Sequence, residues 1–349
     1  MLFNMIRPRR LRTGRATIAG VLGGMLLASS VLAADKAMAC DKPPPAVKDL
    51  DLDRFYSDAA GSVVDPKLAS EHEKAVAPLV TFLRHVVSDA DQAVKKHDAG
   101  HGACAVRWLT AWAKGDAWLG KISSAQAEYQ RKWDLGGVAL AYLKVKSYAK
   151  PDEQELIEAW LVRFADASRA FFNDPKRRRN NQWYWLGVGL GATSLATGNE
   201  RLWKEARGVM EDAAADIAPN GTLALELARE RRALYYHAFS LTPLVVLAEL
   251  AHARGEDWYK LKDGALHRLV DVTRRGLQSP EVFEKLAGVA QERPPKPGFG
   301  WLAIYRARFK DKVAAADWPE VPDQHRWLGG DVKLLMRVLD ARQKGDRKG

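Results

Sequence analysis

The sequence predicts an all-α protein that folds as a single, incomplete α/α toroid of about eleven helices. Long stretches repeat apolar residues at helical spacing, as between Ala69 and Lys96, and there is little sign of strands. The helical stretches follow one another as consecutive pairs, and no linker separates two halves of the chain. The 349 residues are 47% hydrophobic, which is enough to bury one large core.

The first 39 residues differ from the rest and are predicted to be a secretory signal peptide. Five arginines precede an apolar run from Ala19 to Ala33, and small residues follow at Ala37-Met38-Ala39. The run is too short and wrongly flanked for a membrane-spanning helix. A twin-arginine address at Arg9-Arg10 is the alternative interpretation of the basic start. We expect export to the periplasm or beyond, no later membrane span, and one domain over residues 40–349.

The charge of the chain narrows the class of partner. It carries 54 Lys and Arg against 43 Asp and Glu, a net charge of +11. The leader holds five arginines and Lys36 against Asp35, so a chain that begins at Cys40 keeps a net charge of +6. A moderately basic exported protein favours polyanions. Nucleic acid is one polyanion, but export and the lack of a recognisable binding module argue against it.

Two cysteines remain after the leader, Cys40 and Cys104. An oxidising compartment makes a disulfide between them the expected state, and it would tie the extended Pro43-Pro44-Pro45 segment to the helical body. The alternative is a lipidated Cys40, because the residues before it resemble a lipobox. No leucine stands at the third position before Cys40, and Asp35-Lys36 interrupts the apolar run, so the sequence favours the disulfide.

The expected helices of the first half follow apolar residues three or four positions apart. Gly100 and Gly102 end the first of them, and Pro151 is a favourable first residue for a later one. The expected ranges are Ala69 to Lys96, Ala105 to Ala113, Ser123 to Lys146, a helix from Pro151, Asn180 to Ala196, and Glu200 to Ile217.

The second half continues with the same spacing. The Asn220-Gly221 turn leads into a long apolar helix that is expected to hold Arg232. Residues 40–65 and 293–325 lack a regular pattern and are expected at the rims of the toroid. The remaining expected helices are Trp258 to Leu277, Pro280 to Gln291, Gly300 to Phe309, and Leu328 to Gln343.

Two motifs that suggest ligand sites have simpler structural explanations. The glycine-rich run from Gly187 to Ala192 lies inside a helical pattern with no strand before it, so its small residues are expected to let helices approach closely rather than to bind phosphate. His97 and His101 are four residues apart, but Gly100 interrupts the helix and no third ligand is near in sequence. We expect neither a metal nor a cofactor.

The stretch from Arg177 to Leu241 concentrates polar groups that suit a sugar acid. Its first part holds arginines, asparagines and Gln182 beside aromatic residues, and its last part holds further arginines, two tyrosines and His237. Amides, guanidiniums and phenols all bind carboxylates and hydroxyls. One helix-turn unit, Asn199 to Gly221, separates the two parts, so consecutive inner helices of a toroid would bring both to one groove.

Several short motifs occur in the order and spacing of a known family. They are Ala103-Cys104-Ala105 with Trp108, Ala111-Trp112-Ala113, Arg131-Lys132-Trp133, Asn180-Asn181 with Tyr184-Trp185, Glu226-Leu227, Arg232-Ala233-Leu234 with Tyr236-His237, and Leu328-Gly329-Gly330. With these motifs the chain resembles the bacterial alginate lyase family, which cleaves polymannuronate and folds as a periplasmic α/α toroid. The resemblance runs through most of the chain after the leader, and it implies an acidic polysaccharide as the binding partner.

The resemblance implies roles residue by residue, and two of them are altered in this chain. Asn181 matches an asparagine that helps to neutralise the uronate carboxylate, Arg232 matches the catalytic-site arginine, and Trp185 matches a tryptophan that contacts substrate. Gln182 stands where the family has histidine. Phe239 stands where the family has its catalytic tyrosine.

The chemistry of β-elimination states what such a site must provide. The C5 proton beside the carboxylate is removed, so the carboxylate must first be neutralised by amides or a guanidinium. A base then takes the proton, and an acid supplies one to the departing O4. In mannuronate and glucuronate the C5 proton and O4 lie on the same face of the sugar ring, so one phenol serves as both base and acid. Guluronate has them on opposite faces and needs a separate base such as histidine.

A neighbouring tyrosine is the candidate for the missing phenol. Tyr235 is three residues after Arg232 and four before Phe239, so the three are expected on one helical face. Arg232 is expected to lower the pKa of the phenol from its usual value of about 10. Tyr236 and His237 are the adjacent alternatives, and simple packing is the other interpretation of Tyr235.

The candidate site therefore comprises two sets of residues. The catalytic candidates are Asn181, Gln182, Arg232, Tyr235, Tyr236 and His237. The substrate-binding candidates are Arg178, Arg179, Asn180, Trp183, Tyr184, Trp185, Arg229, Phe239 and Lys67, the last of which lies near a family lysine that reaches substrate.

Three functions from different classes fit these residues. The first is a polysaccharide lyase that cleaves a mannuronate- or glucuronate-type polymer by β-elimination. The second is an inactive, lyase-derived polyuronate-binding protein that assists exopolysaccharide export in a secretion complex, because the family histidine and tyrosine are both replaced. The third is a toroidal glycoside hydrolase that uses Glu226 and Glu230 as its two carboxylates. Amides, arginine and aromatics at the matched positions favour the first, and we expect a monomer.

Overall fold

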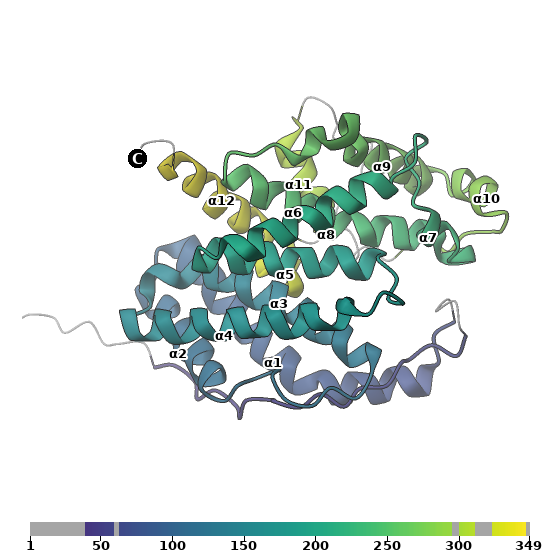
Figure 1. Ribbon diagram of the computed structural model, residues 1–349. Helices are drawn as coiled ribbons and strands as arrows, with labels where there is room; N and C mark the ends of the chain where they lie inside the picture. The colour runs from purple at the N-terminus through teal and green to yellow at the C-terminus, as the bar shows by residue number, and fades with distance from the viewer. Residues whose placement is uncertain (1–38, 59–62, 295–299, 311–322, 347–349) are drawn as a thin grey trace, which may run out of the picture. The chain divides into compact units, whose positions relative to one another are not determined.

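The computed structural model describes residues 39–58, 63–294, 300–310 and 323–346 (Figure 1). Apart from Ala39, the leader expected over residues 1–39 lies outside the described residues. The described chain is helical and confirms the predicted all-α class, with two strands of two residues each, β1 (Gln324–His325) and β2 (Gly330–Asp331). The helices are α1 (Pro66–Lys96), α2 (Ala99–Lys114), α3 (Ala125–Val145), α4 (Pro151–Ala170), α5 (Asn181–Thr197), α6 (Glu200–Asp216), α7 (Ala224–Leu227), α8 (Ala233–Ala253), α9 (Leu261–Gln278), α10 (Glu281–Ala287), α11 (Gly300–Arg308) and α12 (Val332–Asp346).

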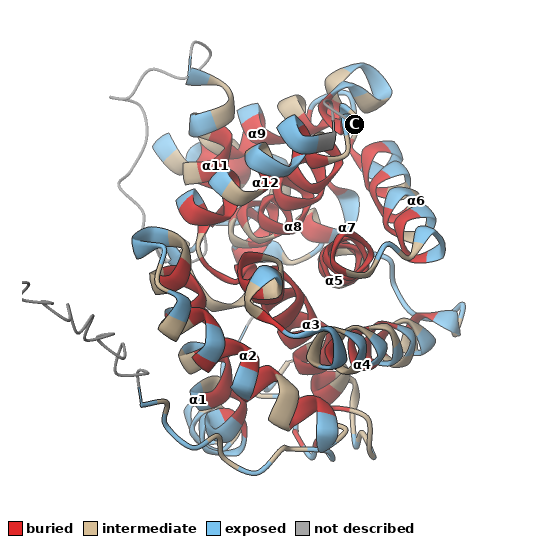
Figure 2. Cartoon of the chain, turned by 90° about the vertical axis from the view of Figure 1, so that its left-hand side faces the viewer, coloured by how far each residue is buried: buried red, intermediate tan, exposed pale blue. Residues whose placement is uncertain are grey.

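The helices form the two layers of an α/α toroid. Helices α1, α3, α5 and α8 each pack against the next in the inner layer, and α12 contacts α8, α3 and α1. Helices α2, α4, α6 and α9 pack on the outside of these. Figure 2 shows the consequence for burial: α5 is buried around its whole circumference, whereas α4 and α6 keep one exposed face.

Glycines let α5 approach its neighbours closely. A Cβ atom on Gly187 would lie 2.8 Å from Val209 of α6, and one on Gly189 would lie 2.6 Å from Leu135 of α3. Real Cβ atoms do not come so close to other heavy atoms, so only glycine fits at these positions without a shift in the neighbouring helices. This confirms the prediction that the glycine-rich run serves helix packing.

The second helix begins earlier than the sequence predicts. Gly100 and Gly102 were expected between two helices, but both lie inside α2. Asp98 explains the difference, because its Oδ1 accepts hydrogen bonds from the backbone N of Gly100 at 2.8 Å and of His101 at 3.2 Å, and so caps the helix before the glycines. Gly102 leaves room for the ring of Tyr148, which would collide with a Cβ atom there.

Two further boundaries differ from the expectation. Arg232 was expected within the long helix, but it ends a 3₁₀ turn, η3 (Glu230–Arg232), immediately before α8. Glu230 has a φ of 52°, which interrupts the helical path between α7 and α8. The last helix begins at Val332 rather than Leu328, because Gly329 and Gly330 have φ of 70° and 101°.

One described segment corrects the expectation that no stretch after the leader is long and apolar enough to cross a bilayer. Glu230–Ala253, which contains α8, meets both criteria by length and composition. In the structure 89% of its most apolar window is buried inside the protein. The all-round apolar composition is that of an inner helix, which contacts α5, α9, α11 and α12.

The N-terminal arm (residues 39–58) runs along the outside of this body. Cys40 and Cys104 form the predicted disulfide, with their Cα atoms 5.4 Å apart. The indole nitrogens of Trp108 and Trp112 donate to the carbonyls of Asp41 and Pro44, at 3.0 and 3.1 Å. Further along, the backbone N of Leu50 donates to the carbonyl of Lys121 at 2.8 Å. The arm is therefore fixed at several points before it reaches α1.

Reduction of the disulfide is expected to destabilise the protein without unfolding it. The bridge closes a loop with a sequence separation of 64, for which the chain-entropy relation gives about 4 kcal/mol. We expect a reductant to lower the free energy of unfolding by about 2 to 4 kcal/mol, measured by denaturant titration. The Cys40→Ser variant is the control and should not respond to the reductant. Equal unfolding curves for the wild-type protein with and without reductant would contradict this expectation.

Candidate active site

A cleft of about 900 Å³ opens where the two parts of the predicted site meet α1 and α3. Its lining comes from the arm, α1, α3, the start of α5, the start of α8 and the turn η8 (Arg326–Leu328). Among the predicted site residues, those that line the cleft are Asn180, Gln182, Arg229, Tyr235, Tyr236 and Phe239.

The charged groups along the cleft are mainly cationic. Among the described residues, four arginines line it against two carboxylates. Burial lowers the pKa of His72, the histidine among them, which therefore is neutral near pH 7. An excess of guanidinium groups attracts carboxylates. The lining charges are Arg54, Arg84, Arg229 and Arg326 against Asp58 and Glu73.

Arg232 lies among tyrosine rings at the head of α8. Its Nη1 donates a hydrogen bond to Oη of Tyr56 at 3.3 Å, and its guanidinium carbon lies 4.2 Å from the ring centre of Tyr235. The hydroxyls of Tyr56 and Tyr236 are 3.4 Å apart. Tyr56 belongs to the arm, 176 residues before Arg232, and no local pattern in the sequence connects the two.

Tyr235 and Phe239 stand on the same face of α8, as their spacing predicts. Their rings are 6.1 Å apart and nearly parallel, with an interplanar angle of 11°. The expected lowering of the phenol pKa is wrong for the free protein. Burial raises the pKa of Tyr235, and the cation of Arg232 opposes this by a smaller amount. Both Tyr235 and Tyr236 are therefore protonated at neutral pH in the free protein.

The start of α5 presents an amide to the cleft. Asn180 caps the helix, because its Oδ1 accepts a hydrogen bond from the backbone N of Gln182 at 3.1 Å. Gln182 lines the cleft, and its Oε1 accepts a hydrogen bond from Nζ of Lys132 at 2.5 Å. The side-chain nitrogen of Gln182 has no hydrogen-bond partner among the described residues, so this amide has a donor to offer a ligand.

Asn181 lies behind the cleft wall rather than on it. Its backbone N and its Nδ2 both donate to Oε1 of Glu226, at 2.9 and 2.8 Å, and both residues are 1% exposed. Burial raises the pKa of Glu226. Asn181 therefore links the start of α5 to α7, next to Gln182 but without lining the cleft.

His237 is placed in the core of the protein. Its Nε2 accepts a hydrogen bond from the backbone N of Leu223 at 3.0 Å, and its Nδ1 bonds the carbonyl of Ala233 at 2.8 Å. Both ring nitrogens are thus occupied by backbone groups, and the side chain is fully buried. Burial lowers the pKa of His237 to about 4. The structure does not bring this histidine to the cleft.

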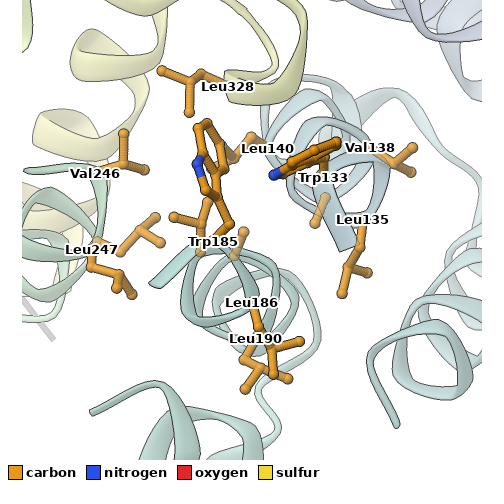
Figure 3. Packing of buried hydrophobic residues seen from close by; sticks show 14 of the residues in the cluster. Trp133, Leu135, Val138, Leu140, Trp185, Leu186, Leu190, Val246, Leu247 and Leu328 are labelled. Carbon is orange, nitrogen blue, oxygen red and sulfur yellow. The ribbon is translucent and has the colours of Figure 1, made fainter. Parts of the chain in front are cut away.

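None of the three aromatic residues after Gln182 lines the cleft. Figure 3 shows Trp185 among core residues such as Leu328 and Val246, and its side chain is fully buried. The hydroxyl of Tyr184 donates to Asp216 at 3.4 Å, and the indole of Trp183 donates to Asp212 at 3.1 Å, both on α6. A helix turns 100° per residue, which carries Trp183 and Tyr184 away from the face of Gln182. Trp185 is three residues on and packs in the core against two rings that line the cleft, with its ring centre 5.5 Å from that of Phe239 and 5.9 Å from that of Trp327.

The remaining basic candidates lie on the surface outside the cleft lining. Arg178 and Lys67 are exposed, and Arg179 pairs with Asp212 at 2.9 Å. Exposed cations are mostly solvated or form weak surface pairs. Their proposed contact with substrate has no support from the geometry of the cleft.

Sequence reasoning missed most of the α3 face of the cleft. Gln126, Tyr129, Gln130 and Trp133 line it, and Trp133 also stacks on Trp327 with ring centres 4.7 Å apart. These residues are spaced three and four apart, so a stripe of amides and aromatics on one helical face was the available signal. The aromatics of this stripe offer flat surfaces of the kind that stack on sugar rings.

Comparison with known proteins shows that the chain is similar to polysaccharide lyases. A family model described as alginate lyase matches residues 50–283. A polysaccharide lyase of Stenotrophomonas maltophilia (strain K279a) is 39% identical over 314 residues, covering 89% of this chain and 94% of that protein. An alginate lyase of Azotobacter vinelandii (strain DJ / ATCC BAA-1303) is 31% identical over 366 residues, covering 95% and 97%.

Solved structures share the fold. Alginate lyase A1-III from Sphingomonas species A1 superimposes with a TM-score of 0.72 at 23% identity, covering 86% of each chain. A histidine-to-alanine variant of alginate lyase A1-III, complexed with tetrasaccharide, gives a TM-score of 0.76 at 24% identity over 85% of each chain. Both comparisons agree with the α/α toroid.

Acid is expected to destabilise the protein through its buried histidines. An unfolded imidazole takes up a proton below about pH 6.5, whereas burial lowers the pKa of His237 and of His325 to about 4. The unfolded state binds more protons between these values, so stability falls as the pH falls from 6.5 to 4, by roughly 3 kcal/mol for the fully buried His237. His325 is partly exposed and contributes less.

Denaturant titrations across this pH range measure the effect. The His237→Gln variant should show a shallower pH dependence, by about one proton, than the wild-type protein. An unchanged slope in this variant would show that His237 is protonated in the folded state.

Proposed function

Because the chain belongs to the alginate lyase family, we propose that it is a polysaccharide lyase that cleaves a uronate polymer by β-elimination. The contact between Arg232 and the tyrosine rings, on a cleft rich in arginine, is the observation that carries the proposal. It joins a carboxylate-binding cation to phenols that transfer protons. A solved relative of the same fold is complexed with tetrasaccharide, which supports a sugar chain as the ligand.

Two groups neutralise the uronate carboxylate in this proposal. The guanidinium of Arg232, at the head of α8, supplies the charge, and the amide nitrogen of Gln182, at the start of α5, supplies a neutral donor. Neutralisation matters most in the transition state, when removal of the C5 proton spreads negative charge onto the carboxylate oxygens. Asn181 supports this wall indirectly, through Glu226 and the start of α5.

Tyr235 transfers the proton. Its phenolate takes the C5 proton, the electron pair forms the C4–C5 double bond, and the new phenol donates the proton to the departing O4. This sequence requires C5–H and O4 on one face, as in mannuronate or glucuronate. Guluronate requires a base on the opposite face, where an amide such as Gln182 accepts no proton at neutral pH. The proposed substrate is therefore a mannuronate- or glucuronate-type polymer.

The cleft does not suit the glycoside hydrolase alternative. That mechanism needs two carboxyl groups on either side of the scissile bond. Glu226 is fully buried and accepts hydrogen bonds from Asn181, and neither Glu226 nor Glu230 lines the cleft. Among the described residues, the carboxylates that do line it are Asp58 of the arm and Glu73 of α1.

Location and assembly are part of the same proposal. The basic and apolar leader supports export to the periplasm. The disulfide between Cys40 and Cys104 agrees with export, because such bonds persist in oxidising compartments. We propose that the protein is a monomer. Membership of an exopolysaccharide secretion complex is proposed only for the alternative function, in which the protein binds polyuronate without cleaving it.

A direct assay tests the activity. We expect the purified protein to release unsaturated uronate product from polymannuronate or polyglucuronate, followed by ultraviolet absorbance, and much less from polyguluronate. The matched control is the Arg232→Ala variant. Saturable binding of a polyuronate with no product would favour the binding-protein alternative, and neither binding nor product from any uronan would reject both.

Two substitutions are expected to separate binding from proton transfer. Arg232→Ala should weaken binding and abolish turnover, because a charge-assisted contact is lost in both the ground and the transition state. Tyr235→Phe should leave affinity nearly intact and lower kcat by about a hundredfold or more. Wild-type kcat/KM should rise with pH above neutrality, because burial raises the pKa of the phenol that must ionise.

Tyr148→Phe is the control for these substitutions, since Tyr148 packs against Gly102 outside the cleft. Its kinetics should match those of the wild-type protein. Full turnover in Tyr235→Phe, with turnover lost in Tyr236→Phe or Tyr56→Phe, would move the proton transfer to another phenol of the cluster.

A further inference from the structure

A buried lysine lies directly behind the cleft wall. Lys132 of α3 is 1% exposed, and its Nζ donates to the carbonyl of Tyr129 at 3.2 Å and to Oε1 of Gln182 at 2.5 Å. The same Nζ lies 4.7 Å from the ring centre of Tyr129 and 4.3 Å from that of Trp133. Burial lowers the pKa of Lys132 well below its usual value.

This lysine differs from the other buried lysine of α3. Lys144 forms an ion pair with Asp91 at 2.6 Å, as buried lysines usually do. Lys132 has no such carboxylate partner among the described residues. Burying an amine without a counter-charge costs free energy, so a fold gains nothing in stability from placing one there. The hydrogen bond to Gln182 is the contact through which Lys132 affects the cleft.

The surroundings of Nζ determine how the amide of Gln182 is turned. Two carbonyl oxygens and two aromatic faces surround the nitrogen, and all of these attract N–H groups. The amine therefore acts as a donor toward Gln182 whether or not it carries a third proton. Because the amide oxygen must face Lys132, the amide N–H₂ group faces away from it, on the side where Gln182 lines the cleft.

We propose that Lys132 is a positioning residue, which holds the Gln182 side chain so that its amide donor faces the uronate carboxylate. The inference rests on the proposed function and adds a residue that never touches the substrate. An unrestrained glutamine amide would present its oxygen as readily as its nitrogen, and an oxygen would repel a carboxylate. Lys132 therefore fixes the orientation of the Gln182 amide, so that Gln182 offers the substrate a hydrogen-bond donor and not an acceptor. It does so without adding a charge to the cleft surface.

A double-mutant cycle tests this role with a mannuronate tetrasaccharide as the probe. Lys132→Met and Gln182→Ala should each weaken binding and lower kcat/KM by about tenfold or more, the size of one hydrogen bond to a charged group. The double variant should be no worse than Gln182→Ala alone, because the lysine acts through the glutamine. With the methyl-esterified tetrasaccharide, the difference between wild-type protein and Lys132→Met should shrink. Losses that add fully in the double variant would overturn the proposal.

Lys144→Met is the matched control on the same helix. Its effect on stability comes from Asp91, so whatever change it causes in binding should add to that of Gln182→Ala. Gln182→Glu tests the direction of the amide without removing the lysine, and it should lose at least as much affinity as Gln182→Ala. Wild-type affinity in Gln182→Glu would overturn the proposal. A wild-type protein that neither binds nor cleaves the tetrasaccharide would instead count against the proposed function itself.

Discussion

The close packing of α5 is the constraint on which the cleft depends. This helix touches α3, α4, α6 and α8, and glycines at 187 and 189 are what allow two of these contacts. Its first residues therefore have a fixed position relative to both α3 and the head of α8. Gln182 contacts Lys132 of α3, and Arg232 contacts Tyr56 of the arm, although these residues come from separate parts of the sequence.

The same close packing sets the chemistry of the phenols. Tyr235 is enclosed by Arg232 and neighbouring rings, so its charged form loses more hydration than the guanidinium restores. A bound uronate adds both a negative charge and its own hydroxyls to this enclosure. Exclusion of water from the cleft therefore has two opposing effects. It strengthens the polar contacts to the carboxylate, and it disfavours the charged phenolate form of Tyr235.

Helical periodicity was sufficient to predict the fold class and most of the helices, because helices such as α1 and α6 keep apolar residues three and four positions apart on one buried face. It also predicted the shared face of Tyr235 and Phe239. Boundaries failed where side-chain caps or left-handed residues decided them, as at Asp98 and Glu230. The site was only partly predictable: neighbours in sequence such as Trp185 and His237 turn into the core, whereas Tyr56 and the α3 stripe reach the cleft through tertiary contacts.

The contact between Tyr56 and Arg232 has a consequence for how the protein responds to its ligand. The cleft combines the arm, α1, α3, α5, α8 and the turn η8, which together span nearly the whole described chain. No smaller piece of the protein contains a complete site. A sugar chain in the cleft therefore binds only the fully folded protein, and by mass action it stabilises all the helices that form the cleft together. Ligand binding and the folding of the whole protein are therefore linked equilibria, so that a change in one shifts the other.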